Sequence, residues 1–563
     1  MTLFNSIIEL STDSCNLLDH GVVTLATVGI VCLLLGSLQV FRPDLNPLPL
    51  AILTNKLSAS DKDFIFIAPY VSTQDGPAIY NLRGELVWDG HEPSSSDNPA
   101  RTVNFHQVQY NGSTHLKYTI FQEAQHGPRR NATHKILNNK YATVEALRSL
   151  NPSMDLDPHD SDVLDDGQRF LQGTKINYPA GTRSEGRLEE AVLQEYDLAT
   201  KRISFEWRSL DHVALRDCCT FPDDPDYFHI NSFQKDEHGN YLTNGFNTCT
   251  TYYINGTSGA IIWTLGGHKP SFRIIDENGD NYKLRHMHHL RIQPLSSVNL
   301  PESLKPNISA STHRAISVFD NAYDTFEFPP TAPSSSAVIL LLDLASRTAQ
   351  IIEHIPHPSG STAAMFGSFS LLPNGDRFIG WGSTRDVSQH SPSGQLLFHA
   401  KIGDENTAVG SSRSFKGRWQ GSPERPPDVY VYAWGCMWPN AVYVSWNGAT
   451  EVRSYRVYGS MPQNEAEEAP FELVAEGPKD GFETRLRTDW YVEFVFVEAL
   501  DEEGGLLGTS RAVQTFRPPL GNSRVCTEWM CPGTMPRQQE NSSCAGGEMF
   551  DGRRAREEQV VLG

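Results

Sequence analysis

The stretch Tyr196–Trp207, YDLATKRISFEW, contains the pattern that decides the fold: a short strand, a polar turn, and a second strand ending in an aromatic residue. The pattern returns as YNLRGELVW from Tyr80, YINGTSGAIIW from Tyr253, LDLASRTAQIIEH from Leu342 and HSPSGQLLFHA from His390. The start-to-start gaps are 116, 57, 89 and 48 residues. Because a propeller blade takes about 50 residues, the first gap holds two units and the third holds one with a long insertion. The repeat therefore predicts six hairpins.

Six amphipathic hairpins cannot bury their apolar faces singly, so they must pack around a common axis. We therefore expect an all-β fold, with a six-bladed β-propeller over residues 58–440 and the substrate site in its axial channel. Unrelated hairpins in an all-β sandwich are the alternative. The 43 Gly and 35 Pro agree with many short turns and exclude helical bundles.

A second, smaller unit is predicted after the propeller, over residues 441–517. Its signals are short alternating strands, which suit an immunoglobulin- or fibronectin-III-like β-sandwich. These strands are expected at Ala441–Gly459, Phe471–Ala475, Thr484–Leu486 and Trp490–Ala499. Residues 518–563 are polar and without periodicity, so we expect a disordered tail.

The net charge limits the kinds of partner that the protein can bind. Asp and Glu number 67 against 47 Lys and Arg, which gives a formal charge of −20. A nucleic-acid binder needs a basic face to meet phosphates, so no nucleic-acid partner is expected.

The N-terminus predicts a membrane anchor. Residues 21–41 carry no charge, and at about 1.5 Å per residue they span about 30 Å, the thickness of a bilayer core. Residues 1–20 contain no Lys or Arg, unlike the start of a cleaved signal peptide, which is the alternative. We expect a polar segment over 1–20 and a single uncleaved transmembrane helix over 21–41.

Charges, sequons and cysteines indicate on which side of the membrane the bulk of the chain lies. Arg42 and Lys56 follow the span and favour a cytosolic bulk by the positive-inside rule. Five glycosylation sequons favour a glycoprotein with a lumenal or extracellular bulk, which we expect. They stand at Asn111, Asn131, Asn255, Asn307 and Asn541. Nine cysteines permit disulfides among Cys218, Cys219 and Cys249 and among Cys526, Cys531 and Cys544.

Histidine dominates the residues able to carry chemistry. The sequence RHMHHLR from Arg285 holds three His and two Arg, and strand alternation predicts that His286 and His288 share one face. The other face would carry Arg285, His289 and Arg291. Arg binds tetrahedral oxyanions and His acts as base or nucleophile, so an anion site is one interpretation. A divalent-metal site and a solvated basic strand are the others.

Two further segments carry histidine. In Asp226–Ser232 the apolar and polar residues alternate, so His229 and Asn231 share a face. His159 lies just before an expected strand. The chain has no nucleophile elbow, Walker-type phosphate loop or H-E-x-x-H zinc helix. A lone strand histidine is usually structural, so only convergence on one channel would make these residues a site.

Longer motifs resemble those of the arylsulfotransferase (ASST-type) propeller family, in its fungal branch. The similarity covers roughly residues 60–516. The motifs are Trp381-Gly382 after Leu372-Pro373-Asn374-Gly375, Val192–Asp197, His229–Ser232, Ile262–Gly267 and Ser445–Val452.

The resemblance implies a six-bladed propeller that transfers a sulfuryl group from a phenolic sulfate ester to another phenol. It implies no nucleotide donor, no cofactor and no metal, because bacterial members form a covalent sulfo-histidine. The family's Gln-His-Asp-Ala-Arg strand becomes Met287–Arg291 here. By this correspondence His288 is the nucleophile and Arg291 its anion partner, while His229 and Asn231 are retained.

The chain departs from the family at Asn244–Asn247, where the family has Ser-Ala-Arg-His. Phe246 and Asn247 replace two groups that would stabilise charge on the sulfuryl group, and losing one such donor typically costs about 10²–10³ in rate. Two alternatives therefore stand beside sulfuryl transfer. One is a propeller that binds or isomerises an aromatic secondary metabolite, and the other is a non-catalytic binding or structural propeller.

The protonation of His288 is the last expectation. A nucleophilic imidazole must be neutral, so activity should fall as His288 protonates near its ordinary pKa of about 6.5. Arg285 and Arg291 would disfavour the imidazolium and lower that pKa.

Overall fold

The computed structural model describes residues 45–517, apart from short gaps. The gaps are residues 46, 71–73, 92–99, 123–129, 183–185, 220–224, 277, 303–304, 306–307, 324–330, 404–409 and 463–468. The predicted anchor at 21–41 and the predicted tail at 518–563 lie outside the described residues. Within them, no helix is both long and apolar enough to cross a bilayer.

The described chain is nearly all β, and residues 50–417 form six mainly antiparallel sheets, each running from an inner strand to an outer one. The first sheet is β26 (Gly410–Gly417), β2 (Phe64–Tyr70), β3 (Ala78–Tyr80) and β4 (Leu86–Asp89). The second is β5 (Ala100–Tyr110), β6 (Ser113–Gln122), β7 (Arg130–Leu137) and β8 (Thr143–Leu147). The third is β9 (Asp155–Leu164), β10 (Arg169–Tyr178), β11 (Leu188–Asp197) and β12 (Ile203–Arg208).

The other three sheets follow along the chain in the same inner-to-outer order. The fourth is β13 (Ile230–Lys235), β14 (Tyr241–Gly245), β15 (Thr250–Ile254) and β16 (Ile261–Gly266). The fifth is β18 (His288–Gln293), β19 (His313–Asp320), β20 (Ser336–Asp343), β21 (Thr348–Pro356) and β17 (Arg273–Ile275). The sixth is β22 (Ser368–Leu371), β23 (Arg377–Gly380), β24 (Asp386–His390), β25 (Leu396–Ile402) and β1 (Leu50–Asn55).

The hairpins that the sequence predicts are present. The repeats from Tyr80, Tyr196, Tyr253, Leu342 and His390 form the hairpins β3–β4, β11–β12, β15–β16, β20–β21 and β24–β25. The unit inferred inside the gap of 116 residues is the hairpin β7–β8. The long insertion after Tyr253 contains β17, which pairs parallel with β21.

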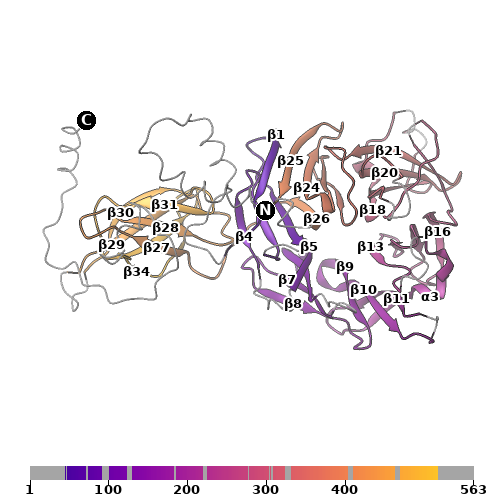
Figure 1. Ribbon diagram of the computed structural model, residues 1–563, viewed down its shortest axis with the longest axis horizontal. Coiled ribbons are helices and arrows are strands. Elements are labelled where there is room, and N and C mark those ends of the chain that lie inside the picture. Colours follow the sequence, from indigo (N-terminus) through magenta and orange to yellow (C-terminus); the bar gives the residue numbers. More distant parts are fainter. Residues whose placement is uncertain are drawn as a thin grey trace, which may run out of the picture.

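The six sheets close into a ring, which Figure 1 shows from one end. The inner strands contact one another in the closed order β26, β5, β9, β13, β18, β22 and back to β26. The ring closes because β26 completes the sheet begun by β2, and β1 joins the sheet of β22–β25. The ring-forming residues thus begin at 50, earlier than the expected boundary at 58. The arrangement is propeller-like.

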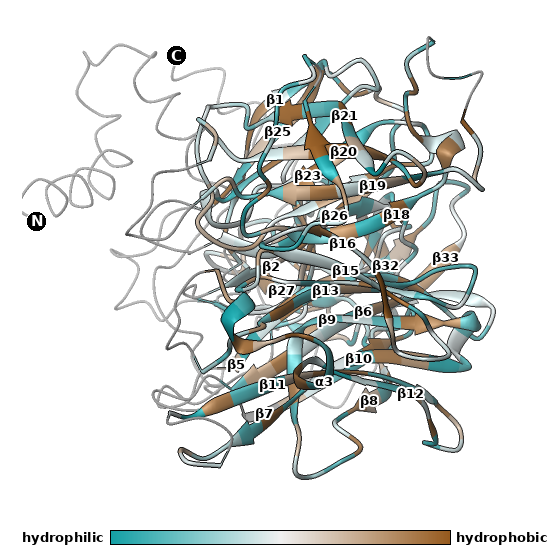
Figure 2. Ribbon diagram, turned by 90° about the vertical axis from the view of Figure 1, so that its right-hand side faces the viewer, coloured by the Kyte–Doolittle hydropathy of each residue, from teal (hydrophilic) through white to brown (hydrophobic). Residues whose placement is uncertain are grey.

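The core lies between neighbouring sheets. Each of the six neighbouring pairs shares a buried apolar cluster, and Figure 2 shows hydrophobic segments on strands such as β23. Between the third and fourth sheets, for example, Trp207 packs with Phe228 and Tyr252. Fully burying one large apolar side chain is worth roughly 1.5–3 kcal/mol, so these clusters hold the sheets face to face.

Residues 428–514 form two further sheets around one apolar cluster. One contains β27 (Asp428–Tyr432), β28 (Ala441–Ser445) and β31 (Glu483–Arg487). The other contains β29 (Ser454–Ser460), β30 (Glu472–Pro478), β32 (Phe494–Leu500), β33 (Leu506–Thr509) and β34 (Val513–Gln514). Strand β27 precedes the expected boundary at 441 and pairs with β28. The immunoglobulin-like topology stays a prediction.

Helical structure is sparse among the described residues. The short helices are α3 (Ser209–His212) and the 3₁₀ turns η2 (Asp165–Gly167), η3 (Leu215–Asp217), η4 (Leu295–Ser297) and η6 (Gly382–Thr384). A disulfide joins Cys219 to Cys249, one of the pairings that the sequence permits. It fixes the segment before β13 to the start of β15.

Candidate active site

Irregularities in the inner strands direct polar side chains to the centre of the ring. In β9 the register with β10 jumps from Ser161 to Leu156, so the residues between them bulge out opposite one residue of β10. The side-chain amide of Asn104 donates to the backbone carbonyls of Pro158 and His159, at 3.0 and 2.5 Å, and holds this bulge. Asn104, His229 and His289 all have left-handed backbone conformations beside register shifts. Such bulges re-aim side chains.

His288 opens β18 and is buried. Its Nδ1 lies 2.7 Å from Oδ1 of Asn321, and its Nε2 accepts a hydrogen bond from the Phe366 amide at 3.2 Å. Asn321 is itself fixed, because its amide donates to the carbonyls of Ala363 and Phe366. An acceptor beside Nδ1 and a donor beside Nε2 set the tautomer, so Nδ1 carries the proton and Nε2 keeps its lone pair.

The pKa of His288 corrects the expectation from sequence. Burial is the largest cause, and together with the charges of His159, Arg413 and His229 it lowers the pKa of His288 to about 3, against the hydrogen bond to Asn321. The expected direction is confirmed, but the pKa falls much further below 6.5, and the main causes are burial, His159, Arg413 and His229 in place of the expected Arg285 and Arg291. His288 is neutral throughout the physiological range.

Two histidine–aspartate pairs stand next to His288. Nδ1 of His159 lies 2.7 Å from Asp157, and Nδ1 of His229 lies 2.8 Å from Asp226. The two imidazole rings meet edge to face, with centroids 4.6 Å apart. Lys175 forms ion pairs with both carboxylates. The carboxylates orient the two rings, as an acid–base pair requires.

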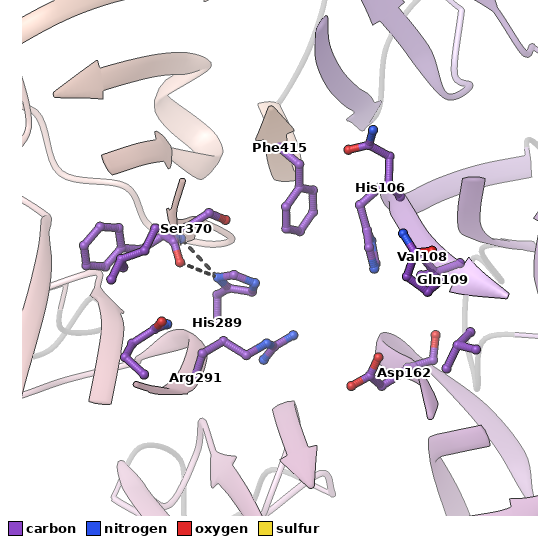
Figure 3. Close-up of a pocket in the computed structure, with 14 residues that line it drawn as sticks. His106, Val108, Gln109, Asp162, His289, Arg291, Ser370 and Phe415 are labelled. Carbon is purple, nitrogen blue, oxygen red and sulfur yellow. Dashed lines mark hydrogen bonds between the residues drawn. The ribbon is translucent and has the colours of Figure 1, made fainter. Parts of the chain in front are cut away.

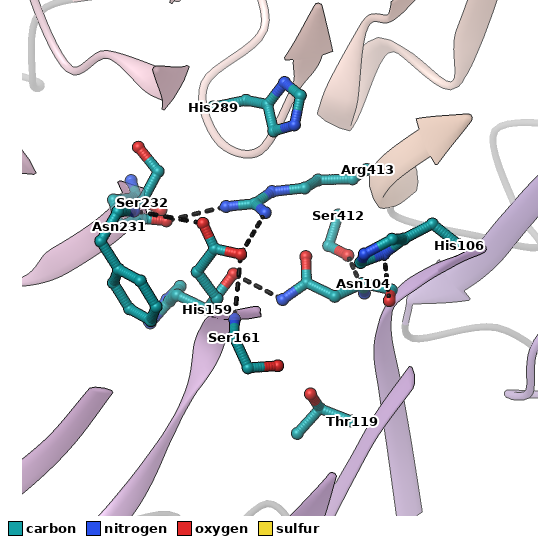
Figure 4. A network of polar contacts seen from close by, with 12 residues as sticks. Asn104, His106, Thr119, His159, Ser161, Asn231, Ser232, His289, Ser412 and Arg413 are labelled. Carbon is teal, nitrogen blue, oxygen red and sulfur yellow. Dashed lines mark hydrogen bonds and ion pairs between the residues drawn. The ribbon is translucent and has the colours of Figure 1, made fainter. Parts of the chain in front are cut away.

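An ion-pair layer crosses the centre of the ring. Asp160 receives Arg413 at 2.8 Å and Arg291 at 3.0 Å, and the second Nη of Arg413 donates to the Asn231 carbonyl at 2.9 Å. Figure 4 shows Arg413 reaching from beside Ser412 towards Asn231. Burial raises the pKa of Asp160, but Arg291 and Arg413 outweigh it and hold that pKa well below its usual range. Two guanidinium groups thus share one ionised carboxylate.

The layer separates two cavities that have no lining residue in common. A small cavity of about 20 Å³ is lined by His288 and Asn231 together with His159, Arg413 and Phe366. It has room for about one water molecule. The buried Nδ2 of Asn231 has no hydrogen-bond partner among the described residues, so the cavity presents an unpaired donor. A larger cavity of about 460 Å³ is lined by Arg291 and His289.

The four predicted site residues are therefore only partly brought together. His288 and Asn231 line the small cavity, and the ring of His229 contacts its wall through His159. Arg291 instead lines the large cavity and pairs with Asp160. Strand alternation correctly separates His288 from His289 and Arg291. The solvated-strand interpretation is wrong, because His286, His288 and His289 are all buried.

Phe246, which by the resemblance stands where the family has an arginine, lies against three histidines. Its ring stacks on His286 with centroids 4.4 Å apart, and it meets His288 and His229 at 5.5 and 5.3 Å. Asn247 turns away and donates to the Asp226 carbonyl at 2.8 Å. The replaced positions thus contribute an aromatic wall, and positive charge near His288 comes from Arg413.

Three residues of this site were not selected from the sequence. Arg413 comes from the last inner strand and Asn321 directly follows β19, and neither stands in a motif near His288. His159 lies in a sequence segment with no motif that links it to His288. Its signal is the Asp157-Pro158-His159-Asp160 run, where proline favours a break in pairing. Within the described residues, no group of three or more His, Cys, Asp or Glu side chains could hold a metal ion.

Comparison with known proteins points to one family. A family model described as arylsulfotransferase (ASST) matches residues 131–403. The match supports an arylsulfotransferase-type family, and it spans His159, His229, Asn231, His288 and Arg291. No curated protein matches the chain.

Solved structures with similar folds are distant. A protein of unknown function from Bacteroides caccae is 11% identical, over 64% of this chain and 100% of its own, with a TM-score of 0.36. Hydrazine synthase of Kuenenia stuttgartiensis is 10% identical over 57% and 91%, with a TM-score of 0.28. A GH43 protein of Bacillus licheniformis is 8% identical over 74% and 91%, also at 0.28. At these scores the structures carry no argument about this chain.

Proposed function

We propose that the chain is a six-bladed propeller enzyme of arylsulfotransferase type, which transfers a sulfuryl group between phenolic compounds through His288. The observation that carries the proposal is the state of His288: it is buried and neutral, Asn321 holds its Nδ1, and its Nε2 lone pair accepts the Phe366 amide on the wall of the small cavity. A nucleophile of this kind needs no separate base to deprotonate it. The family match over residues 131–403 supports the reaction class.

The proposed reaction has two steps, transfer of the sulfuryl group to His288 and transfer from His288 to the acceptor. For the first step the Phe366 amide must release Nε2 and the small cavity must widen, because it has room for only about one water molecule in this structure. Nε2 then attacks the sulfur of an aryl sulfate, the S–N bond forms as the S–O bond to the ring breaks, and the leaving phenolate takes a proton from a protonated histidine. In the second, the acceptor phenol gives its proton to that histidine while its oxygen attacks sulfur and releases His288. His159 lines the cavity and is oriented by Asp157, so it is the proposed acid and base.

Arg413 takes the part that the family resemblance gives to Arg291. It lines the cavity of His288, is 3% exposed, and directs its guanidinium to Asp160 and the Asn231 carbonyl. A buried positive charge beside the sulfuryl oxygens stabilises charge that develops in the transition state. The unpaired Nδ2 of Asn231 is a second donor on the same cavity.

The covalent intermediate gives the direct test. The purified protein is incubated with 4-nitrophenyl sulfate without an acceptor, and the peptide that contains His288 is examined by mass spectrometry. One added sulfuryl group, absent in His288→Asn and present in the surface control His238→Asn, is the expected result. No modification and no turnover with a broad panel of aryl sulfates would contradict the proposal.

A second candidate function is binding or isomerisation of an aromatic metabolite without sulfuryl transfer. Phe246 favours it, because this ring stands against His286, His288 and His229 where the family has charged groups. Thermal unfolding with phenols and with their sulfate esters separates the two functions. Stabilisation by phenols alone favours binding, and stabilisation by the esters favours transfer.

We further propose that residues 21–41 anchor the protein, with the bulk lumenal or extracellular and residues 441–517 forming a sandwich domain. The Cys219–Cys249 disulfide supports an oxidising compartment. Sequons such as that of the exposed Asn111 would then carry glycans. Protease protection of microsomes, followed by deglycosylation and gel mobility, tests both points, and an unprotected, unglycosylated chain would place the bulk in the cytosol.

A further inference from the structure

The large cavity on the other side of the Asp160 layer is unused by the proposed reaction. Its volume of about 460 Å³ is typical of small-molecule sites, and it shares no lining residue with the cavity of His288. Its walls come from the inner strands β5, β9, β18, β22 and β26. A ligand bound there contacts none of the residues assigned to sulfuryl transfer.

One wall of this cavity is aromatic. The ring of Phe415 lies between two imidazoles, 4.8 Å from His106 and 5.5 Å from His289. Figure 3 shows these three rings directed to the middle of the cavity. Burial lowers the pKa of both histidines well below the usual value, with nearby cations adding to the effect. The wall is therefore uncharged at neutral pH and suits a planar ring.

The facing wall carries the charge. Arg291 is the only Lys or Arg among the lining residues, its side chain is 22% exposed, and Figure 3 shows it pointing inward opposite Asp162. Its carboxylate partner Asp160 is shared with Arg413, so with Asp162 the layer and the wall hold two cations for two anions. Behind the wall, the buried ammonium of Lys117 donates to Ser161 and adds positive charge. Asp162 is the only acid of the lining.

We propose that this cavity is a second binding site, for an aryl oxyanion whose ring lies against Phe415 and whose anionic oxygens bind Arg291. A positive charge in excess next to an aromatic wall matches a ligand that joins one ring to one anionic group. Aryl carboxylates and aryl sulfates share this chemistry. Phenols lack the charge and inorganic sulfate lacks the ring.

Calorimetric titration of the full chain tests the proposal. His288→Asn is the background, so that no sulfate ester is turned over, and the probes are benzoate, phenyl sulfate, phenol and inorganic sulfate. We expect benzoate or phenyl sulfate to bind at least about tenfold more tightly than phenol or inorganic sulfate. Binding of benzoate alone identifies carboxylates as the ligand, and binding of phenyl sulfate alone identifies sulfates.

Variants then locate the bound ligand. Phe415→Leu removes the ring and Ser370→Phe fills the cavity, and each should weaken the better ligand about tenfold or more. Phe366→Leu, on the wall of the small cavity, should leave that affinity unchanged. Thermal unfolding checks each variant, and Ser370→Phe decides if Phe415→Leu does not fold. The proposal is overturned if neither anion binds, if phenol binds as tightly, or if only Phe366→Leu weakens binding.

Discussion

The two cavities on the axis of the ring are built from the same kind of inner strand but differ in how those strands run. Around the small cavity the backbone bulges at Asn104, at residues 157–160 and at His229, and the bulges bring His and Asp side chains together. Around the large cavity most of the strand residues lie beyond these bulges in regular register, apart from the left-handed His289, and they include Phe415 and Gln293. Irregular backbone thus gathers the residues of the closed site, and mostly regular backbone lines the open cavity.

The difference in charge follows from the Asp160 layer between them. Arg413 faces the small cavity and Arg291 the large one, and both depend on one carboxylate. Each cavity therefore has one arginine on its wall, which is the group we propose to meet an anion. We therefore assign sulfuryl transfer to the small cavity and ligand binding to the large one. A separate variant can test each assignment.

The largest effect is expected at His288. His288→Asn removes the neutral imidazole whose Nε2 faces the small cavity, so turnover of an aryl sulfate should fall by about 10⁴-fold or more. The free energy of unfolding should change little, because the amide can keep a bond to Asn321. Steady-state kinetics and urea unfolding measure both. If His288→Asn kept wild-type turnover, the small cavity would not be the catalytic one.

The next effect concerns the layer. Asp160→Asn leaves the buried guanidinium of Arg413 without its charged partner, and we expect a loss of about 3–5 kcal/mol in the free energy of unfolding. Asp162→Asn is the matched control, since Asp162 lies on the same strand and the ion pairs of both arginines go to Asp160 instead. Urea unfolding of both variants measures the difference. If Asp160→Asn and Asp162→Asn had the same free energy of unfolding, the ion pairs of Asp160 would not stabilise the layer between the cavities.

The sequence predicted the hairpins well because each one is a local signal. A turn between two short strands, as at Tyr196–Trp207, is fixed by neighbouring residues. The bulge at residues 157–160 depends instead on Asn104 from another sheet, so no local pattern reports it. For the same reason His159 and Arg413 were not combined with His288, from which they are far in sequence. The direction of the His288 pKa was predicted, but not its extent, because burial, its largest cause, is a property of the closed ring.

Replacing each of the two arginines with lysine tests separately what each one does. Arg413→Lys should lower turnover about 10²-fold, since an ammonium cannot bind Asp160 and the Asn231 carbonyl as the guanidinium fork does. Arg291→Lys should lower turnover less and weaken the aryl oxyanion instead. Kinetics with an aryl sulfate and calorimetry with benzoate measure the two responses. The opposite ranking would restore Arg291 as the anion partner of His288.

The smallest effect is a dependence of stability on pH. A buried histidine that stays neutral in the folded protein takes up a proton on unfolding, so the free energy of unfolding should fall as pH falls from 6.5 towards 3. His288 behaves in this way with a pKa of about 3, and burial lowers the pKa of His106, His134 and His289 in the same direction. Burial raises the pKa of Asp162 and Asp320 to about 6, which acts in the opposite sense between about pH 4 and 6.

With His390, five histidines have a lowered pKa, and with Asp63 and Glu189, four acids have a raised one, so we expect a net loss of stability on acidification. His288→Asn removes one of the five histidines, and the slope of the free energy of unfolding against pH should become shallower by at most about 1.4 kcal/mol per pH unit. Urea unfolding between pH 4 and 7 measures it, with His238→Asn as the exposed control. An unchanged slope in His288→Asn would mean that His288 titrates normally, as a solvent-filled small cavity would allow, and the contrast between a closed and an open cavity would fail.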